Sequence, residues 1–296
     1  MAILRVTNLT KNYGKHEVLK GIDLVFDKPG IYALVGPNGS GKSTLFNIIS
    51  NLLKPTSGEI EVVGKKNTDA SIFYEVSFLK DNRVLYEYLS GYEHLTFIES
   101  AQKLPHKRVD EVIEKMQIAH YVHKKVGDYS LGMKQQLLIA MAMLNKPKLM
   151  ILDEPVNGLD PTSVIKVRYL LKELAENGTT ILISSHTLSE IDLLTDNIMF
   201  LKDGKIVEEK IDIYNNIYSI TLEDDFENLE NLLKEYEYKL EEKELRVNLI
   251  DKDIFELLSI FNENQIKYLD ISKVKRGTEE RYMEMFPEEM AKIQQY

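Results

Sequence analysis

At Gly36-Pro37-Asn38-Gly39-Ser40-Gly41-Lys42-Ser43-Thr44 the chain fits the phosphate-binding pattern G-x-x-x-x-G-K-[ST] at every fixed position. The apolar run Ile31–Val35 precedes this loop and predicts a buried strand, and Leu45–Leu53 follows it with helical spacing. A strand, a glycine-rich turn and a helix start form the context that such a loop requires. We therefore predict a site in which backbone N–H groups and a helix N-terminus bind phosphate groups.

Two side chains of the loop carry specific chemistry. Lys42 is expected to place its ammonium on the β- and γ-phosphates of a nucleotide, and Ser43 its hydroxyl on Mg²⁺. The other loop residues expected to contact the nucleotide are Gly36, Asn38, Gly39, Ser40, Gly41 and Thr44. The alternative is a glycine-rich turn that matches by chance, and the strand and helix patterns on either side argue against it.

Length and composition narrow the class of protein. The 296 residues allow about two domains, and an apolar fraction of 44% suffices for a buried core. The absence of cysteine excludes a disulfide framework, thiolate catalysis and a zinc finger. The N-terminus reads straight into a strand, so no signal peptide is expected. Because no apolar run approaches about 20 residues, we expect no segment that spans a bilayer by itself.

Charge is unevenly distributed along the chain. The net charge is −10, from 47 acidic and 37 basic residues. Residues 211–296 hold 21 acidic and 11 basic residues, which leaves 26 of each (47 − 21 and 37 − 11) for residues 1–210. An acidic C-terminal part argues against nucleic-acid binding, which requires a basic face.

Residue patterns predict two domains. Residues 1–210 alternate strand and helix patterns, including expected strands at Glu59–Val63 and Ser71–Leu79. Helical spacing dominates from about residue 85 to 145, which predicts an inserted helical lobe. We expect an α/β fold in which helices flank a mixed sheet. Residues 211–296 follow a β-α-β-β-α-β order, which predicts a small, acidic α+β accessory domain of ferredoxin-like type. Its helices are expected at Phe226–Lys234, Asp253–Phe261 and Glu279–Gln294.

Two acidic residues follow a continuous apolar run that predicts a buried strand. The run Leu149–Leu152 predicts a strand buried on both faces, and Asp153 and Glu154 follow at its C-terminal end, where α/β sheets bind ligands. Asp153 is expected to hold Mg²⁺ opposite Ser43, and Glu154 to act as the general base for an attacking water. The alternative, two surface acids after a core strand, would be preferred only if the phosphate-binding loop were absent.

These motifs resemble the nucleotide-binding subunit of an ATP-binding cassette (ABC) transporter over about Ile3–Glu209. The corresponding motifs are the Walker A loop Gly36–Thr44, the signature Tyr129–Met133, the Walker B strand Leu149–Glu154, the D-loop Gly158–Asp160, the switch residue His186 and the adenine-stacking residue Tyr13. The resemblance implies a P-loop ATPase core, the ligands ATP and Mg²⁺, catalytic roles for Glu154 and His186, and nucleotide contacts from Asp160. By themselves, Tyr13 and His186 would be read as packing and structural residues.

Two motifs depart from the family pattern. The signature is Tyr-Ser-Leu-Gly-Met instead of Leu-Ser-Gly-Gly-Gln; it keeps Ser130 and Gly132, which the family uses to bind the γ-phosphate. This variant resembles the ABC-2-type exporter branch. Asp81 stands where the family has a glutamine or glutamate, so the resemblance implies a metal-contacting residue with a shorter side chain.

The resemblance also implies partners. A signature helix in the inserted lobe lies far from its own Walker A loop, so two chains would pair head-to-tail around two ATP molecules, as a homodimer or with a similar ATPase subunit. A separate transmembrane permease would bind a groove near Asp81–His94, which places the chain at the cytoplasmic face of the cell membrane. The residues Tyr86, Tyr88, Leu89 and Tyr92 are expected either to contact this permease or to form the core of the lobe.

The function favoured by the sequence is therefore ATP binding and hydrolysis that power export through a permease. One alternative is a non-transport ABC ATPase that acts as an ATP-gated regulatory or assembly clamp. Another is a P-loop kinase, for which the signature and D-loop stretches would be accidental.

Overall fold

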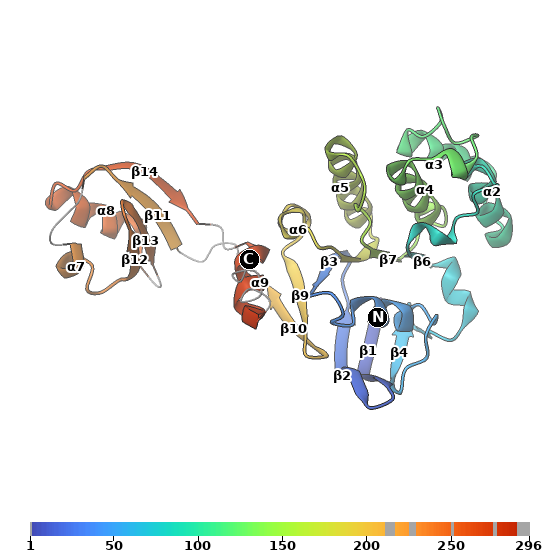
Figure 1. Cartoon of the computed structure of the whole chain (residues 1–296), viewed down its shortest axis with the longest axis horizontal. Coiled ribbons are helices and arrows are strands. Elements are labelled where there is room, and N and C mark those ends of the chain that lie inside the picture. The colour runs from blue at the N-terminus through green and yellow to red at the C-terminus, as the bar shows by residue number, and fades with distance from the viewer. Residues whose placement is uncertain (1, 211–216, 225–228, 250–251, 275–276, 289–296) are drawn as a thin grey trace. The chain divides into compact units, whose positions relative to one another are not determined.

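The computed structural model describes residues 2–210, 217–224, 229–249, 252–274 and 277–288. Its contacts divide the chain into two compact units (Figure 1). The described residues up to Lys210, together with those from Tyr282 onward, form the larger unit. The described residues of the segment Ile211–Arg281 form the smaller unit.

A six-stranded sheet forms the centre of the larger unit, in the order β10-β9-β3-β8-β7-β6. Its strands are β3 (Gly30–Val35), β6 (Val76–Leu79), β7 (Leu149–Asp153), β8 (Thr180–Ser184), β9 (Asn197–Lys202) and β10 (Lys205–Lys210). All neighbours are parallel except β9 and β10. The sheet is therefore mixed, and the predicted α/β fold class is confirmed.

A second, antiparallel sheet has the order β2-β1-β4-β5. Its strands are β1 (Leu4–Tyr13), β2 (His16–Phe26), β4 (Ser57–Val62) and β5 (Lys65–Lys66). Helix α1 (Lys42–Ile49) buries Leu45, Phe46, Ile48 and Ile49 in a core that also contains residues of both sheets. Because α1 begins directly at the phosphate-binding loop, this shared core fixes the position of the loop.

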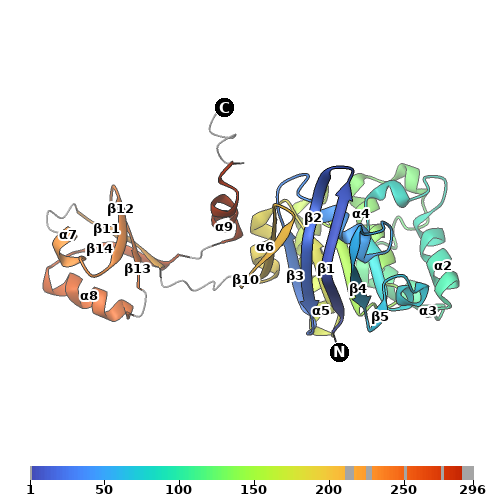
Figure 2. The same cartoon turned by 90° about the horizontal axis from the view of Figure 1, so that it is seen from below.

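The remaining helices of the larger unit are α2 (Gly91–Gln102), α3 (Lys107–Met116), α4 (Leu131–Met143), α5 (Pro161–Glu176), α6 (Leu188–Leu194) and α9 (Thr278–Met285), which ends in this unit. Helices α2, α3 and α4 gather at one end of the unit and form the predicted helical lobe (Figure 1, Figure 2). Short 3₁₀ turns lie at Ala70–Tyr74, Asn82–Val84 and Val126–Asp128.

The expected strand Ser71–Leu79 was partly wrong, because its first half forms a 3₁₀ turn and only Val76–Leu79 forms strand β6. The side chain of Asp69 explains the difference: its carboxylate accepts a hydrogen bond from the Ser71 N–H at 2.8 Å. Such local side-chain capping favours a turn over an extended strand.

The smaller unit is a four-stranded antiparallel sheet with the order β12-β13-β11-β14. Its elements are β11 (Ile217–Leu222), α7 (Leu229–Leu232), β12 (Glu237–Glu241), β13 (Glu244–Asn248), α8 (Ile254–Glu263) and β14 (Tyr268–Lys273). Ile220, Leu245 and Val247 of the sheet pack with Leu257 and Phe261 of α8 in a separate core. This is the predicted β-α-β-β-α-β, ferredoxin-like arrangement. Residues 226–228 and 289–294 of two predicted helices lie outside the described residues.

The central sheet supplies a test of the packing. Leu182 of β8 is fully buried, so Leu182→Ala is expected to lower the free energy of unfolding by about 2–5 kcal/mol. Leu52→Ala removes the same atoms from a side chain that is 58% exposed. This control is expected to change the free energy of unfolding by less than about 0.5 kcal/mol. Urea denaturation followed by circular dichroism measures both, and equal effects would contradict the assigned core.

Candidate functional site

The phosphate-binding loop connects β3 to α1, and its lysine is buried. Lys42 is 7% exposed, and its Nζ donates hydrogen bonds to the carbonyl groups of Gly36 at 2.7 Å and Pro37 at 3.1 Å. Burial lowers the pKa of Lys42, whereas the nearby carboxylates of Glu154 and Asp153 act to raise it. An ammonium held this way, with only carbonyl acceptors, is available to a phosphate group.

Glycine is required at two positions of the loop. Gly41, which precedes α1, has a φ of 108°, in the region that favours glycine. A Cβ atom at Gly36 would lie 2.8 Å from the carbonyl oxygen of Leu201 in β9. The loop therefore packs closely on the end of β9, which leaves no space for a side chain at Gly36.

The carboxylate of Asp153 lies between two hydroxyl groups. Ser43 Oγ donates to Asp153 Oδ2 at 2.8 Å, and Ser184 Oγ donates to Asp153 Oδ1 at 2.6 Å. Asp153 and Ser184 are direct neighbours in the parallel register of β7 and β8. The predicted pairing of Asp153 with Ser43 is thus present, whereas the sequence analysis missed Ser184. Its place at the C-terminal end of a strand next to β7 was the signal that could have found it.

This hydroxyl–carboxylate pair fits a Mg²⁺ ion that takes its other ligands from phosphates and water. Within the described residues, no group of three or more histidine, aspartate or glutamate side chains is arranged to hold a metal by itself. A site that shares its metal with a nucleotide needs no such group, because Mg²⁺ at phosphate sites is commonly bound by one or two protein ligands.

Glu154 and His186 face each other across the ends of β7 and β8. His186 Nε2 lies 3.0 Å from Glu154 Oε1, and the His186 N–H donates to Glu154 Oε2 at 3.3 Å. The Glu154 N–H donates to Ser184 Oγ at 3.1 Å. Burial raises the pKa of Glu154; His186 and Lys42 act to lower it and Asp153 to raise it further.

The backbone at Glu154 is unusual, because its φ of 53° lies in the left-handed region. For a non-glycine residue this conformation costs free energy and is concentrated at functional sites. The turn directs the carboxylate toward His186 instead of continuing the strand. The arrangement provides a partly buried base next to an imidazole, which can accept a proton from a bound water.

The signature residues begin helix α4. Ser130 is the N-cap of this helix, as predicted, and its Oγ accepts a hydrogen bond from the Met133 N–H at 3.2 Å. Leu131, which replaces a glycine of the family pattern, is 50% exposed and contacts Gly158 of the D-loop, where a Cβ atom would lie 2.3 Å from its side chain. Gly132 also lies at this contact, with a Cβ position 3.3 Å from the Gly158 carbonyl oxygen.

Tyr13 is an exposed ring at the end of β1. Its side chain is 52% exposed, and Lys11 Nζ lies 5.1 Å from the ring centroid. The exposure disfavours the alternative that Tyr13 is a packing residue. A nucleotide base can stack on a ring presented in this way.

Two predicted ligand residues are occupied by contacts within the chain. Asp81 Oδ1 lies 2.9 Å from Arg83 Nε, and its Oδ2 lies 2.7 Å from Arg83 Nη2, which lowers the pKa of Asp81. Asp160 caps α5: its Oδ1 accepts from the Thr162 N–H at 3.0 Å, and its Oδ2 accepts from Ser163 Oγ at 2.6 Å. A metal or nucleotide at either carboxylate would have to compete with these bonds.

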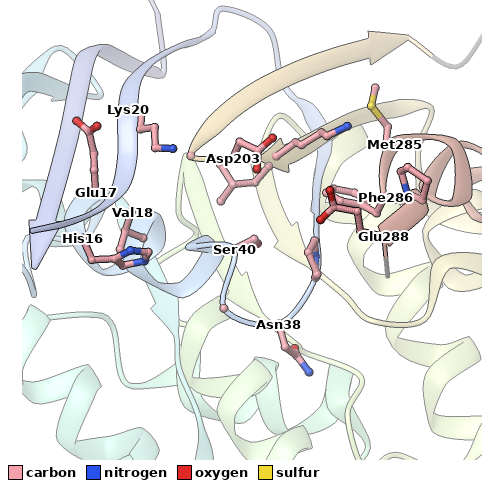
Figure 3. Close-up of a pocket in the computed structure, with 16 residues that line it drawn as sticks. His16, Glu17, Val18, Lys20, Asn38, Ser40, Asp203, Met285, Phe286 and Glu288 are labelled. Carbon is pink, nitrogen blue, oxygen red and sulfur yellow. The ribbon is translucent and has the colours of Figure 1, made fainter. Parts of the chain in front are cut away.

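A pocket beside the phosphate-binding loop contains residues that the sequence analysis did not assign to the site. Figure 3 shows His16 and Val18 on one side of Ser40, and Phe286 and Glu288 on the other. Phe286 is 7% exposed; its ring centroid lies 6.3 Å from that of Phe200 in β9 and 4.7 Å from that of Tyr282. The residues that follow α9 therefore form one wall of the pocket next to the loop.

Comparisons with known proteins agree with this geometry. A family model described as ABC transporter matches residues 19–157, and a model described as an AAA domain matches residues 125–192. The chain is 30% identical to the uncharacterized ABC transporter ATP-binding protein YhcH of Bacillus subtilis, over 99% of this chain and 98% of that protein. It is 37% identical to the lantibiotic transport ATP-binding protein SrtF of Streptococcus pyogenes, over 70% of this chain and 90% of that protein. It is 39% identical to the bacitracin transport ATP-binding protein BcrA of Enterococcus faecalis, over 70% and 68%.

Solved structures give the same result. One, the ATP-binding subunit of an ABC transporter, matches with a TM-score of 0.66 and 29% identity over 71% of this chain and 90% of that chain. Another is an ATP-binding cassette in a dimeric, post-hydrolysis state bound to ADP and phosphate, with a TM-score of 0.61 and 28% identity over 70% and 98%. Given the ordered motifs, the geometry around Glu154 and the match to YhcH over nearly its full length, the chain belongs to the family of ABC transporter ATP-binding proteins.

Proposed function

We propose that this chain works as one half of a head-to-tail ATPase pair that powers export through a separate permease. The observation that carries the proposal is the pairing of Glu154 with His186 beside the Ser43–Asp153 pair. A base and a hydroxyl–carboxylate pair at the ends of adjacent strands supply the parts that water-mediated phosphoryl transfer needs. A kinase would instead require a bound acceptor in place of the water.

In this proposal the nucleotide lies on the Walker A loop, with its base against Tyr13. Lys42 would exchange its two carbonyl acceptors for phosphate oxygens, and Ser43 and Asp153 would hold Mg²⁺. When bound, the ion would neutralise charge on the phosphates. Glu154 accepts the proton of the attacking water, and His186 keeps the Glu154 carboxylate oriented and ionised.

Pairing of two chains is supported by the position of the signature. Ser130 and Gly132 begin a helix of the lobe, and an N-terminal helix end favours anions. The D-loop lies against the same residues, through the contact between Gly158 and Leu131. We propose that both segments act on the nucleotide of the partner chain, as the dimeric state of a solved relative suggests.

A membrane partner is supported by exposed aromatic residues. Tyr86 is 57% exposed and Tyr88 68% exposed, so neither belongs to the core of the lobe, whereas Leu89 and Tyr92 are half-buried. Large apolar side chains grouped on a surface favour a protein interface. We propose that the segment Tyr86–Leu89 binds a cytoplasmic part of the permease, which would place the chain at the cytoplasmic face of the membrane. The similarity to transport ATP-binding proteins favours this function over a non-transport clamp.

No helix among the residues that the structure describes is long and apolar enough to cross a membrane.

The role of Lys42 can be tested by calorimetry. Lys42→Ala removes the ammonium from the loop, so we expect binding of ATP to weaken by at least about tenfold. Lys54→Ala, which removes an exposed lysine after α1, serves as the control and should leave affinity unchanged. Unchanged binding by Lys42→Ala would contradict the assigned phosphate site.

The role of Glu154 can be tested by separating binding from turnover. Glu154→Gln retains the shape of the side chain but removes the base, so we expect ATP to bind while phosphate release slows by about 10²–10⁴-fold. Pairs of two chains with ATP bound between them should then accumulate, as measured by size-exclusion chromatography in the presence of ATP. Phosphate release near the parent rate would remove Glu154 from the base role.

The pH dependence of kcat provides a further test. Glu154 must be ionised to act as a base, and burial raises its pKa, so activity should fall on acidification at a higher pH than for an exposed glutamate. Because His186 acts to lower the pKa of Glu154, His186→Ala should move this acidic limb to still higher pH. A limb that stays in place in His186→Ala would contradict the coupling of the two side chains.

A further inference from the structure

Two adjacent glutamines of the signature helix α4 bond to other elements of the same chain. Gln135 is 6% exposed, and its Nε2 donates to the carbonyl groups of Pro155 at 2.9 Å and Glu154 at 3.2 Å. These two bonds join α4 to the residues that follow β7. Gln136 points to different partners, in α5 and in the lobe.

Gln136 links a tyrosine of the lobe to the D-loop. Tyr121 Oη donates to Gln136 Oε1 at 2.6 Å, and Gln136 Nε2 donates to Ser163 Oγ at 3.1 Å. Ser163 Oγ in turn donates to Asp160 Oδ2 at 2.6 Å. In each of these three bonds the donor is the residue nearer to Tyr121 and the acceptor is the residue nearer to Asp160.

The series continues in the other direction to the start of α2. Tyr129 Oη donates to the Tyr121 carbonyl at 3.0 Å, and the two rings lie perpendicular with centroids 5.0 Å apart. The Gly91 N–H, a donor at the start of α2 that has no partner within the helix, lies close to the Tyr129 hydroxyl and acts to lower the pKa of Tyr129, which burial raises. A Cβ atom at Gly91 would lie 2.5 Å from that hydroxyl, so glycine is required there.

Three residues of this series are buried, which makes the loss of any one of its hydrogen bonds costly. Tyr121 is 4% exposed, Tyr129 6% and Ser163 9%. Burial raises the pKa of both tyrosines, so their hydroxyls remain protonated donors at neutral pH. A buried group that loses its partner carries a desolvation cost, so the members tend to stay bonded or to separate together.

We propose that Gln136 is a positioning residue that holds the signature and the D-loop as one body and connects both, through Tyr121 and Tyr129, to the start of α2. This inference rests on the proposed function, in which the signature and the D-loop act on the partner's ATP and the segment before α2 binds the permease. A displacement of that segment would then move both nucleotide-contacting segments together.

The variant Gln136→Glu tests the link to the D-loop. The new carboxylate still accepts from Tyr121 Oη but cannot donate to Ser163. The single hydroxyl hydrogen of Ser163 would have to leave Asp160 to bond to the new carboxylate, so the series is broken on the side of the D-loop. In the Glu154→Gln background, we expect the ATP concentration for half-maximal pairing to rise by about threefold to tenfold. Binding of ADP to the single chain should be unchanged, because the Walker A loop is untouched. Gln136→Met removes both bonds and should have at least the same effect.

Lys166→Met is the matched control. It removes another hydrogen bond between the lobe and α5, which Lys166 Nζ donates to Gln117 Oε1 at 3.0 Å. This bond is not part of the series that contains Gln136. It should pair at the parent ATP concentration. Pairing of Gln136→Glu at the parent concentration, or an equal loss of ADP affinity, would overturn the inference.

Amide hydrogen exchange on the nucleotide-free chain tests the inference without a pair. Tyr121→Phe keeps the ring and removes the hydroxyl, so we expect the Thr162 and Ser163 amides, which Asp160 caps, to exchange at least about threefold faster. Unchanged exchange would overturn the inference. If two copies of the Glu154→Gln chain never pair when ATP is added, the proposed function is contradicted. The hydrogen-exchange result does not need a pair, so it would still decide whether Gln136 is a positioning residue.

Discussion

The site depends on the carboxylate of Asp153, which is held between the hydroxyls of Ser43 and Ser184. These two bonds join the start of α1 to the ends of β7 and β8. An acid at the end of a buried strand is costly unless polar groups meet it, and here both of its oxygens are met. The arrangement fixes the phosphate-binding loop relative to the edge that carries Glu154 and His186. The loop and the catalytic pair therefore form one constellation, although more than 100 residues separate them in the sequence.

The Walker A loop and the signature differ in whether one chain can complete their site. The Walker A loop is complete within one chain, since Lys42 and the backbone around Gly41 come from a single turn. The signature instead begins a helix of the lobe and packs against the D-loop of its own chain through Leu131 and Gly158. In the proposed pair, this division would leave the signature of one chain to act on the nucleotide of its partner. It also gives the departure from the family signature a physical role, because the side chain of Leu131 fills space next to a D-loop glycine.

Much of this structure could be predicted from the sequence, because the decisive features are local. The loop pattern, the apolar run before Asp153 and the N-cap at Ser130 each depend on neighbouring residues. The β-α-β-β-α-β succession of elements in the smaller unit followed from its alternating patterns. Features that depend on distant partners were missed. The sequence does not reveal that Ser184 bonds to Asp153 or that the ring of Phe286 lies near Phe200 of β9. The ion pair between Arg83 and Asp81 is local and was missed as well. The turn at Ala70–Tyr74 was misread because one capping side chain outweighed an apolar pattern.

A mixing experiment tests the central claim most directly, namely that each nucleotide site is built from two chains. Lys42→Ala lacks a working Walker A loop, and Ser130→Ala lacks a working signature, so each alone should hydrolyse ATP poorly. In a mixed pair, one site combines the intact loop of one chain with the intact signature of the other. We predict that mixing the two inactive proteins restores ATP hydrolysis. A mixture no more active than its separate components, or full activity of Ser130→Ala alone, would contradict the account.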